Sequence, residues 1–95
     1  MLVLVTYDVN TETPSGRKRL RQVAKACQDY GQRVQNSVFE CVVDSVQLLI
    51  MRDRLVKIIE PQKDSLRFYV MSNDKGRVDH YGVSPSFKVT EPLIL

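Results

Sequence analysis

The chain has 95 residues, of which 43% are hydrophobic and 26% are charged, and its formal net charge is +3. A chain of this size forms one domain, residues 1–95, with a small core, so an oligomer would add to its stability. The first apolar stretch is too short for a membrane span or a signal-peptide core, and no basic leader precedes it. We therefore expect a cytoplasmic protein with no membrane partner.

The two cysteines and the single histidine give no sign of a structural framework. Cys27 and Cys41 lie within apolar patterns and are expected to be reduced and buried. His80 has no neighbouring cysteine or second histidine, which argues against a zinc site and favours a strand residue with a local hydrogen bond.

The chain opens with a dense apolar run, Leu2–Tyr7, that ends in one carboxylate, Asp8. Valine, threonine and tyrosine favour strands, and so uniform a run predicts a central strand covered on both faces. A carboxylate at the carboxyl end of such a strand is suited to metal or phosphate chemistry. Position alone leaves a second interpretation equally open, in which Asp8 starts a turn or caps the next helix.

A first helix is predicted to begin within residues 13–16, which offer N-cap candidates, with Pro14 suited to the first helical position. Near its end, Gly31 fits the left-handed C-cap position. The apolar stripe of this helix has the expected spacing and comprises Leu20, Val23, Ala24 and Cys27.

The same helix carries a concentration of positive charge. Five cations fall within residues 17–25, at the end of a helix where the macrodipole favours anions. Most basic helix faces are only solvated, but this concentration indicates an anionic partner. The cations between residues 16 and 33 are Arg17, Lys18, Arg19, Arg21, Lys25 and Arg33, against the single acid Asp29.

Residues 32–43 are strand-like but are interrupted by the turn formers Asn36 and Ser37, which predicts a short strand near 33–35 and a longer one over 38–43. A second helix is predicted to be capped at Asp44 and Ser45 and to stop before Pro61. Its expected core stripe comprises Leu48, Met51, Leu55 and Ile58, with Leu49 and Val56 beside it. We expect its exposed side to be an ordinary solvated face with no patch.

The last third of the chain predicts further strands. Residues 66–71 form an apolar strand, residues 73–76 read as a hairpin turn, and residues 77–81 read as a polar edge strand. Residues 87–89 could add one more strand. Residues 92–95 end the chain with three aliphatic side chains, and we expect the segment from about residue 84 onward to pack on a partner protomer.

This order of elements predicts an α+β fold, a ferredoxin-like βαββαβ arrangement with one or two extra C-terminal strands. Two helices would cover one face of an antiparallel sheet, with the first strand and the 66–71 strand at its centre. The other sheet face would remain apolar, and an exposed apolar face predicts an interface. We therefore expect a homodimer that forms through the sheet faces.

Familiar catalytic motifs are absent from the sequence: there is no nucleophile–base pair, P-loop or zinc-protease signature. Any enzymatic chemistry then depends on Asp8, which alone is insufficient. Mg²⁺ usually takes one or two carboxylates and fills its remaining positions with water and phosphate. A two-fold dimer could supply a second Asp8, and a cation between the two carboxylates would relieve their repulsion.

The sequence also resembles the CRISPR-associated Cas2 family over essentially its whole length. The resemblance rests on Tyr7-Asp8-Val9 at the end of the first strand, the arginine-rich helix, and residues 31–40, GQRVQNSVFE. This paired signature, in a chain of this length, is quite specific, and it is most similar to the branch that accompanies type I-C CRISPR systems.

The resemblance implies a ferredoxin-like homodimer in which the Asp8 residues of two protomers face each other across a Mg²⁺-dependent site. It implies a subunit of a spacer-acquisition complex that holds double-stranded protospacer DNA and bridges two dimers of a CRISPR integrase subunit. Some family members are described as metal-dependent nucleases on RNA or DNA, so a metal-dependent endonuclease activity is an open expectation. The candidate catalytic residues carried over are Asp8, which is also the metal ligand, Tyr7, Ser37 and Phe39.

The other candidate residues bind nucleic acid: Arg33, which precedes the second signature, and the basic helix. Phe39 has a stronger structural interpretation as a core aromatic, and Ser37 reads equally well as a turn residue. Two alternative functions remain: a toxin-like metal-dependent endoribonuclease on a related dimeric scaffold, and a non-catalytic ferredoxin-like regulatory domain. The second alternative leaves the basic helix unexplained.

Overall fold

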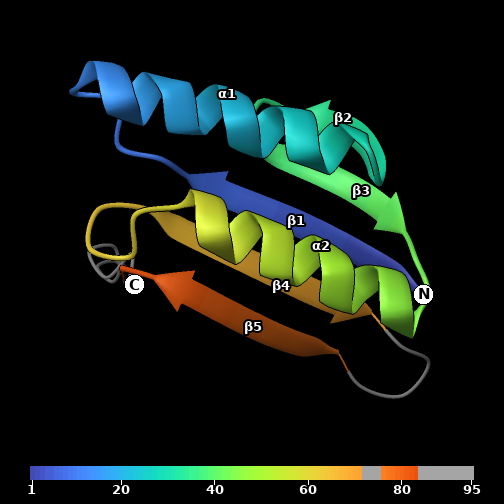
Figure 1. Cartoon of the computed structure of the whole chain (residues 1–95). Helices are drawn as coiled ribbons and strands as arrows, with labels where there is room; N and C mark the ends of the chain where they lie inside the picture. Colours follow the sequence, from blue (N-terminus) through green and yellow to red (C-terminus); the bar gives the residue numbers. More distant parts are fainter. Residues whose placement is uncertain (72–75, 84–95) are drawn as a thin grey trace, which may run out of the picture.

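The computed structural model describes residues 1–71 and 76–83. Seven elements follow one another in the order β1, α1, β2, β3, α2, β4 and β5 (Figure 1). Their bounds are β1 Leu2–Asp8, α1 Pro14–Gln28, β2 Gly31–Gln35, β3 Val38–Val42, α2 Ser45–Ile58, β4 Ser65–Met71 and β5 Arg77–Gly82. The predicted strand over 87–89, the C-terminal tail and most of the predicted hairpin turn lie outside the described residues.

The strands form one antiparallel sheet in the order β2-β3-β1-β4-β5. Strand β1 lies in the middle, paired with β3 on one side and β4 on the other, because its uninterrupted apolar sequence suits the most protected position. The polar strand β5 forms one edge, as its sequence predicts. The predicted ferredoxin-like βαββαβ fold with an additional C-terminal strand is confirmed.

Helix α1 begins as predicted. Thr13 is its N-cap, with the side-chain oxygen accepting a hydrogen bond from the backbone N–H of Gly16 at 3.1 Å, and Pro14 opens the first turn. The prediction for its other end is wrong, because the C-cap is Asp29 and Gly31 is already the first residue of β2. Gly31 serves a different purpose: a β-carbon there would collide with Cys41 on the neighbouring strand.

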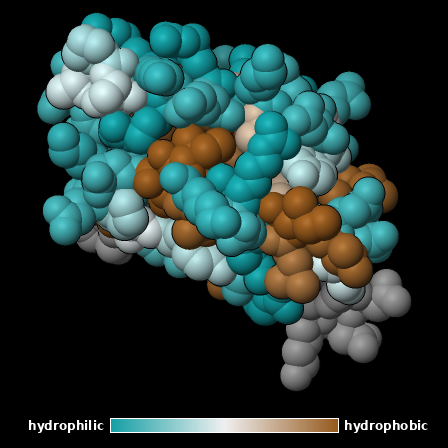
Figure 2. Space-filling view, in the orientation of Figure 1, coloured by the Kyte–Doolittle hydropathy of each residue, from teal (hydrophilic) through white to brown (hydrophobic). Residues whose placement is uncertain are grey.

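Helix α2 begins with a capping box in which the Asp44 carboxylate and the Gln47 side chain satisfy each other's backbone N–H groups. The expected core residues Leu48, Met51 and Leu55 are buried. The expectation of a patch-free outer face is wrong. Figure 2 shows apolar side chains gathered over the N-terminal half of this helix, and the exposed ones are Val46, Leu49 and Ile50, at 64%, 61% and 55% exposure.

Both helices lie on the same side of the sheet (Figure 1). Side chains alternate along each strand, so every second residue of β1, starting with Val3, packs beneath the helices while its neighbours point to the other side. We call these two sides the helix face and the open face. The buried core on the helix face includes Val3, Val5, Phe39, Cys41, Leu66 and Phe68 from the strands and Val23, Cys27, Met51 and Leu55 from the helices.

The open face is partly apolar, as the sequence predicts. The β1 residues Leu2 and Leu4 are half-buried there. Three large exposed side chains from other strands lie on the same face: Val42 (77% exposed), Met71 (42%) and Val78 (53%). Val42 and Met71 are the pairing partners of Leu2, and Val78 pairs with Tyr69, the partner of Leu4. No helix of the described residues is long and apolar enough to cross a membrane.

Candidate metal and nucleic-acid site

Asp8 lies exposed at the carboxyl end of β1, on the open face of the sheet. Its pairing partner on β4 is Ser65, and the next row of the same face brings together Thr6, Arg67 and His80. The His80 ring nitrogen Nε2 lies 2.9 Å from the carbonyl oxygen of Val83, which is the predicted local hydrogen bond. The open face therefore presents a carboxylate beside a row of polar side chains.

Tyr7 points in the opposite direction from Asp8 because adjacent strand residues face opposite sides. Its ring is 5% exposed, stacks on Phe39 with 6.2 Å between ring centroids, and its hydroxyl donates to the carbonyl oxygen of Asn36 at 3.4 Å. Burial raises the pKa of Tyr7, and the nearby charge of Arg33 opposes that rise only in part. Tyr7 and Asp8 are neighbours in sequence, but they lie on different faces of the sheet.

Phe39 is fully buried in the core beneath the helices. Its ring contacts Tyr7 on one side, and the guanidinium carbon of Arg33 lies 5.2 Å from its centroid, within the range of a cation–π interaction. This geometry supports the interpretation of Phe39 as a core aromatic. The Phe39 side chain packs in the core on the helix face and does not reach the open face, on which Asp8 lies.

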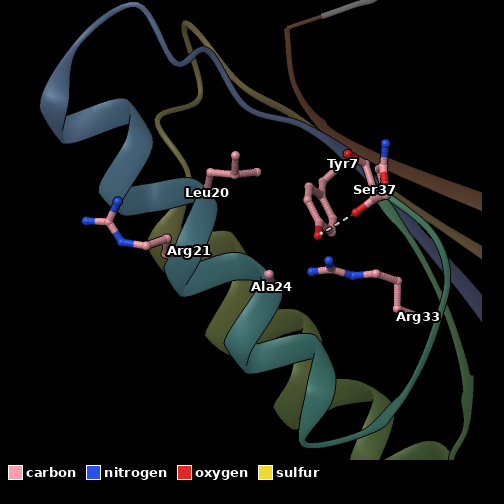
Figure 3. A pocket seen from close by; sticks show the side chains of 7 residues that line it. Tyr7, Leu20, Arg21, Ala24, Arg33 and Ser37 are labelled. Carbon is pink, nitrogen blue, oxygen red and sulfur yellow. Dashed lines mark hydrogen bonds between the residues drawn. The ribbon is translucent and has the colours of Figure 1, made fainter.

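Ser37 lies in the turn between β2 and β3, and its carbonyl oxygen accepts a hydrogen bond from the backbone N–H of Tyr7 at 3.1 Å. Together with Arg33 and Asn36 it borders a pocket between this turn and α1 (Figure 3). Ser37 thus lies near Tyr7 and Arg33. The structure divides the predicted catalytic set into Asp8 on one face and the other three residues on the opposite face.

The basic surface of α1 is largely as predicted. Arg17, Lys18, Arg21 and Lys25 are exposed, and none of them forms a salt bridge within the described residues. Arg17 donates one hydrogen bond to the carbonyl oxygen of Thr11 at 3.2 Å. These four cations, which we call the α1 basic surface, form a solvent-facing row of positive charge.

Arg19 differs from its neighbours because a buried carboxylate holds it. Its Nε and Nη2 atoms donate to the two oxygens of Asp64 at 2.8 and 3.2 Å, and Asp64 is 0% exposed. The backbone N–H groups of Asn10 and Glu60 also donate to this carboxylate. Arg19 is therefore engaged inside the fold, which separates it from the α1 basic surface.

Asp64 was not among the predicted site residues, although it bonds to the loop that follows Asp8. Its burial raises the pKa of the carboxyl, but the hydrogen bonds from Arg19, Glu60 and Asn10 outweigh burial and hold the pKa below its usual value. Its own carbonyl oxygen accepts from the backbone N–H of Val83 at 2.8 Å. In sequence Asp64 reads only as a turn residue 45 positions from Arg19.

Arg67 is a second residue that the sequence analysis missed. It is the partner of Thr6, two positions before Asp8, and it lies on the same open face. Its Nη1 atom donates to the Tyr69 hydroxyl at 3.2 Å. The signal was present in the sequence, since Arg67 interrupts an apolar strand at a position that alternation assigns to the face opposite Phe68.

One copy of the chain fits Mg²⁺ only in part. No group of three or more histidine, cysteine, aspartate or glutamate side chains within residues 1–71 and 76–83 could hold a metal. The exposed Asp8 carboxylate is nevertheless a hard oxygen ligand of the kind Mg²⁺ takes singly or in pairs, with water completing the shell. Within the described residues of one copy, Asp8 is therefore a single candidate ligand and not a complete site.

The chain matches the family model "CRISPR associated protein Cas2" over residues 1–77. It is 58% identical to the CRISPR-associated endonuclease Cas2 of Halalkalibacterium halodurans over 95 residues, covering 99% of both chains. It is also 58% identical to the CRISPR-associated endoribonuclease Cas2 of Chlorobaculum tepidum over 96 residues, covering both chains completely.

A solved structure supports the same relationship. The fold is similar to the crystal structure of Streptococcus pyogenes Cas2 at pH 6.5, with a TM-score of 0.71 and 62% sequence identity, over 78% of this chain and 89% of that one. The family match covers the signature around Asp8, the basic helix and the signature around Phe39. This chain belongs to the CRISPR-associated Cas2 family.

Proposed function

We propose that the chain is the spacer-acquisition subunit of a CRISPR system: a homodimeric scaffold that binds double-stranded protospacer DNA and bridges dimers of the CRISPR integrase subunit. The observation that carries this proposal is the α1 basic surface. Its four exposed cations form no salt bridges with carboxylates of the described residues, and phosphate groups are the partners that would offset them. The family match over residues 1–77 supports assignment to a CRISPR system, and we further propose that this system is of type I-C, the branch that the signatures around Asp8 and Phe39 resemble.

The dimer is proposed to form through the open faces of two sheets. Exposed Val42, Met71 and Val78 support this arrangement, because large apolar side chains on one face are stabilised by a partner surface. Packing of the open faces about a two-fold axis would bring together the two Asp8 carboxylates. They would then hold Mg²⁺, which supplies polarisation of a phosphate group and activation of water when bound.

Double-stranded DNA binding is tested by reversing charge on the α1 basic surface. Arg17→Glu with Arg21→Glu places acids near the N-terminal end of a helix, where the macrodipole favours them, so the fold should survive. We expect duplex binding at least tenfold weaker, with the slope of log affinity against log salt reduced by roughly one unit per lost phosphate contact. Arg19 is left unchanged because its partner is buried Asp64.

The matched control is Lys57→Glu with Lys63→Glu, which makes the same change in charge on another exposed surface. It should bind duplex DNA within about threefold of the unmodified chain. Asp8→Ala should also keep duplex binding. If the α1 variant and the control variant lost the same amount of duplex affinity, binding would depend on net charge alone, and the proposed DNA surface would be contradicted.

Bridging of the integrase is tested by co-purification with a CRISPR integrase subunit, using the full chain and a chain lacking residues 87–95. Loss of the integrase alone would identify the tail as its docking segment. Loss of dimerisation would indicate exchange of the tails between protomers. Failure of both the full and the shortened chain to co-purify with the integrase would contradict the bridging role.

A second function, favoured by the exposure of Asp8, is Mg²⁺-dependent cleavage of phosphodiester bonds. The relatives from Halalkalibacterium halodurans and Chlorobaculum tepidum are named an endonuclease and an endoribonuclease. The test compares the purified chain with Asp8→Ala on both DNA and RNA, with and without Mg²⁺. We expect cleavage to disappear on substitution and on metal removal, and activity that survives in Asp8→Ala would assign the cleavage to a contaminant.

A further inference from the structure

The pocket between α1 and the β2–β3 turn lies on the helix face, across the sheet from Asp8. It has a volume of about 340 Å³, which is within the range of small-ligand sites. Its lining residues are Tyr7, Leu20, Arg21, Ala24, Arg33, Asn36 and Ser37. Only Arg21 of this lining belongs to the α1 basic surface, and Asp8 is not part of the lining.

The lining divides into an apolar part and a cationic part. Leu20 and Ala24 of α1 form one wall (Figure 3). Arg33 reaches beneath Tyr7 toward this wall, whereas the guanidinium of Arg21 points away from Tyr7 toward the outside (Figure 3). The pocket therefore combines an apolar wall with one inward cation and a second cation at its rim.

Arg33 is held in place without a neutralising partner. Its guanidinium carbon lies 5.2 Å from the centroid of the buried Phe39 ring, which fixes the direction of the side chain. Within the described residues Arg33 forms no salt bridge. A planar guanidinium whose charge no carboxylate of the described residues offsets is suited to bidentate recognition of a phosphate.

Two polar groups of the pocket suit the same ligand. Ser37 and Asn36, in the turn, offer a hydroxyl and an amide, whereas the Tyr7 hydroxyl already donates to the carbonyl oxygen of Asn36. Leu20 and Ala24 supply an apolar surface on which a sugar can pack. A bare inorganic anion would leave this wall uncovered, so the lining favours a phosphate with an organic group attached.

We propose that this pocket binds one nucleotide unit, with its phosphate on Arg33 and its sugar against Leu20 and Ala24. The unit is either a free nucleotide or the phosphorylated end of a nucleic-acid strand. The site is separate from Asp8, which faces the other side of the sheet. It borders the proposed duplex surface, with which it shares Arg21.

The probes are deoxycytidine 5′-monophosphate, deoxycytidine, inorganic phosphate, and a single-stranded tetrathymidylate with and without a 5′-phosphate. Binding to the full chain is measured by calorimetry and by NMR of the backbone amides. We expect a phosphorylated nucleotide probe to bind at least tenfold more tightly than its unphosphorylated counterpart or inorganic phosphate. The amide signals of Ala24, Asn36 and Ser37 should shift, and that of Asp8 should not.

Two variants and their matched controls locate the binding. Arg33→Gln removes the inward cation, and Ala24→Leu fills the apolar part of the pocket, so each should weaken binding at least tenfold. Lys63→Gln removes a charge elsewhere, and Gln22→Leu adds a leucine at an exposed position of α1; both should bind as the unmodified chain does. Thermal unfolding of every variant confirms that the fold is retained.

Binding of the free nucleotide supports a small-ligand site, and binding of the phosphorylated oligonucleotide alone supports a strand-end site. Either result supports the proposal only if Arg33→Gln and Ala24→Leu both lose that binding. Absence of binding by all probes, or equal binding by Ala24→Leu and Gln22→Leu, overturns the proposal. Duplex binding measured on the same samples keeps this result distinct from the proposed scaffold function. Ala24→Leu should leave duplex affinity unchanged.

Discussion

Arg19 and Asp64 form a two-pronged ion pair, with Nε–Oδ2 and Nη2–Oδ1 distances of 2.8 and 3.2 Å, that joins α1 to the segment entering β4. Hydrogen bonds from the backbone N–H groups of Asn10 and Glu60 complete the shell around the carboxylate. The pair therefore connects the loop after Asp8, the first helix and the end of the second helix. A mutation that breaks it should disturb all three segments.

Asp64→Asn should destabilise the fold by about 3 kcal/mol, because it leaves the half-buried guanidinium of Arg19 without its charged partner. Chemical denaturation measures this loss. Asp53→Asn, which alters an exposed pair with Lys57 instead, is the control and should change the free energy of unfolding by less than about 1 kcal/mol. Equal effects of the two substitutions would refute the structural role of Asp64.

The same carboxylate should give stability a defined dependence on pH. Asp64 has a folded-state pKa below its ordinary value of 3.8, so the folded state favours the charged form. Its stabilisation is complete above that ordinary value and is lost as pH falls through the lowered one. The difference in unfolding free energy between the unmodified chain and Asp64→Asn should stay constant from pH 7 to about pH 5 and shrink below about pH 3.8. A difference that grows on acidification would contradict this sign.

Phe39→Ala should cost about 3–5 kcal/mol of stability, because the ring is fully buried and the substitution leaves a cavity next to Tyr7. Thermal unfolding measures the loss, and any effect on nucleic-acid cleavage should follow the unfolded fraction. Phe39→Leu, which retains most of the side-chain volume, should keep much of the stability and much of any cleavage activity. A variant that folded normally but lost cleavage would instead indicate a direct role in the chemistry.

Leu4→Lys should convert the proposed dimer into monomers, because it places a charge at the centre of the open face, between Glu40 and Tyr69. Light scattering after size-exclusion chromatography measures the mass. Val46→Lys changes an equally apolar but helix-side residue that is 64% exposed, and it should remain dimeric. The reverse result would move the interface from the sheet to the exposed apolar residues of α2.

The two cysteines should be unreactive in the folded chain. Burial raises the pKa of Cys27 to about 12 and that of Cys41 to about 11, so almost no thiolate forms at about pH 8. A thiol reagent such as Ellman's should therefore react slowly with the native chain and rapidly after denaturation in guanidinium chloride. Immediate reaction of either thiol under native conditions would show that its site opens easily.

The central strand, both helix starts and the basic helix were predictable because each depends on local rules. Thr13, Pro14 and Asp44 cap their helices through short-range hydrogen bonds, and the apolar run of β1 determines its position in the sheet. Strand alternation would also have separated Tyr7 from Asp8. The family signature groups them because they are adjacent in the sequence, while the pleat of the strand places them on different faces.

Other features depend on contacts that no local pattern contains. The partner of Arg19 is 45 positions away, so the arginine could not be distinguished from its exposed neighbours. Helix α2 carries apolar side chains on more than one side, and the face that packs on the sheet buries Leu48 and leaves Leu49 and Ile50 exposed. Gly31 also resembled a helix cap, because its close contact with Cys41 depends on the pairing of two strands.

The alternation along β1 places a constraint on the length of this strand. A deletion of one residue between Leu2 and Thr6 would turn Tyr7 toward the open face and put the charge of Asp8 into the core beneath the helices. A deletion of two residues would preserve both directions. Changes in the length of this strand by an even number of residues therefore keep Tyr7 on the helix face and Asp8 on the open face, whereas odd changes exchange the two.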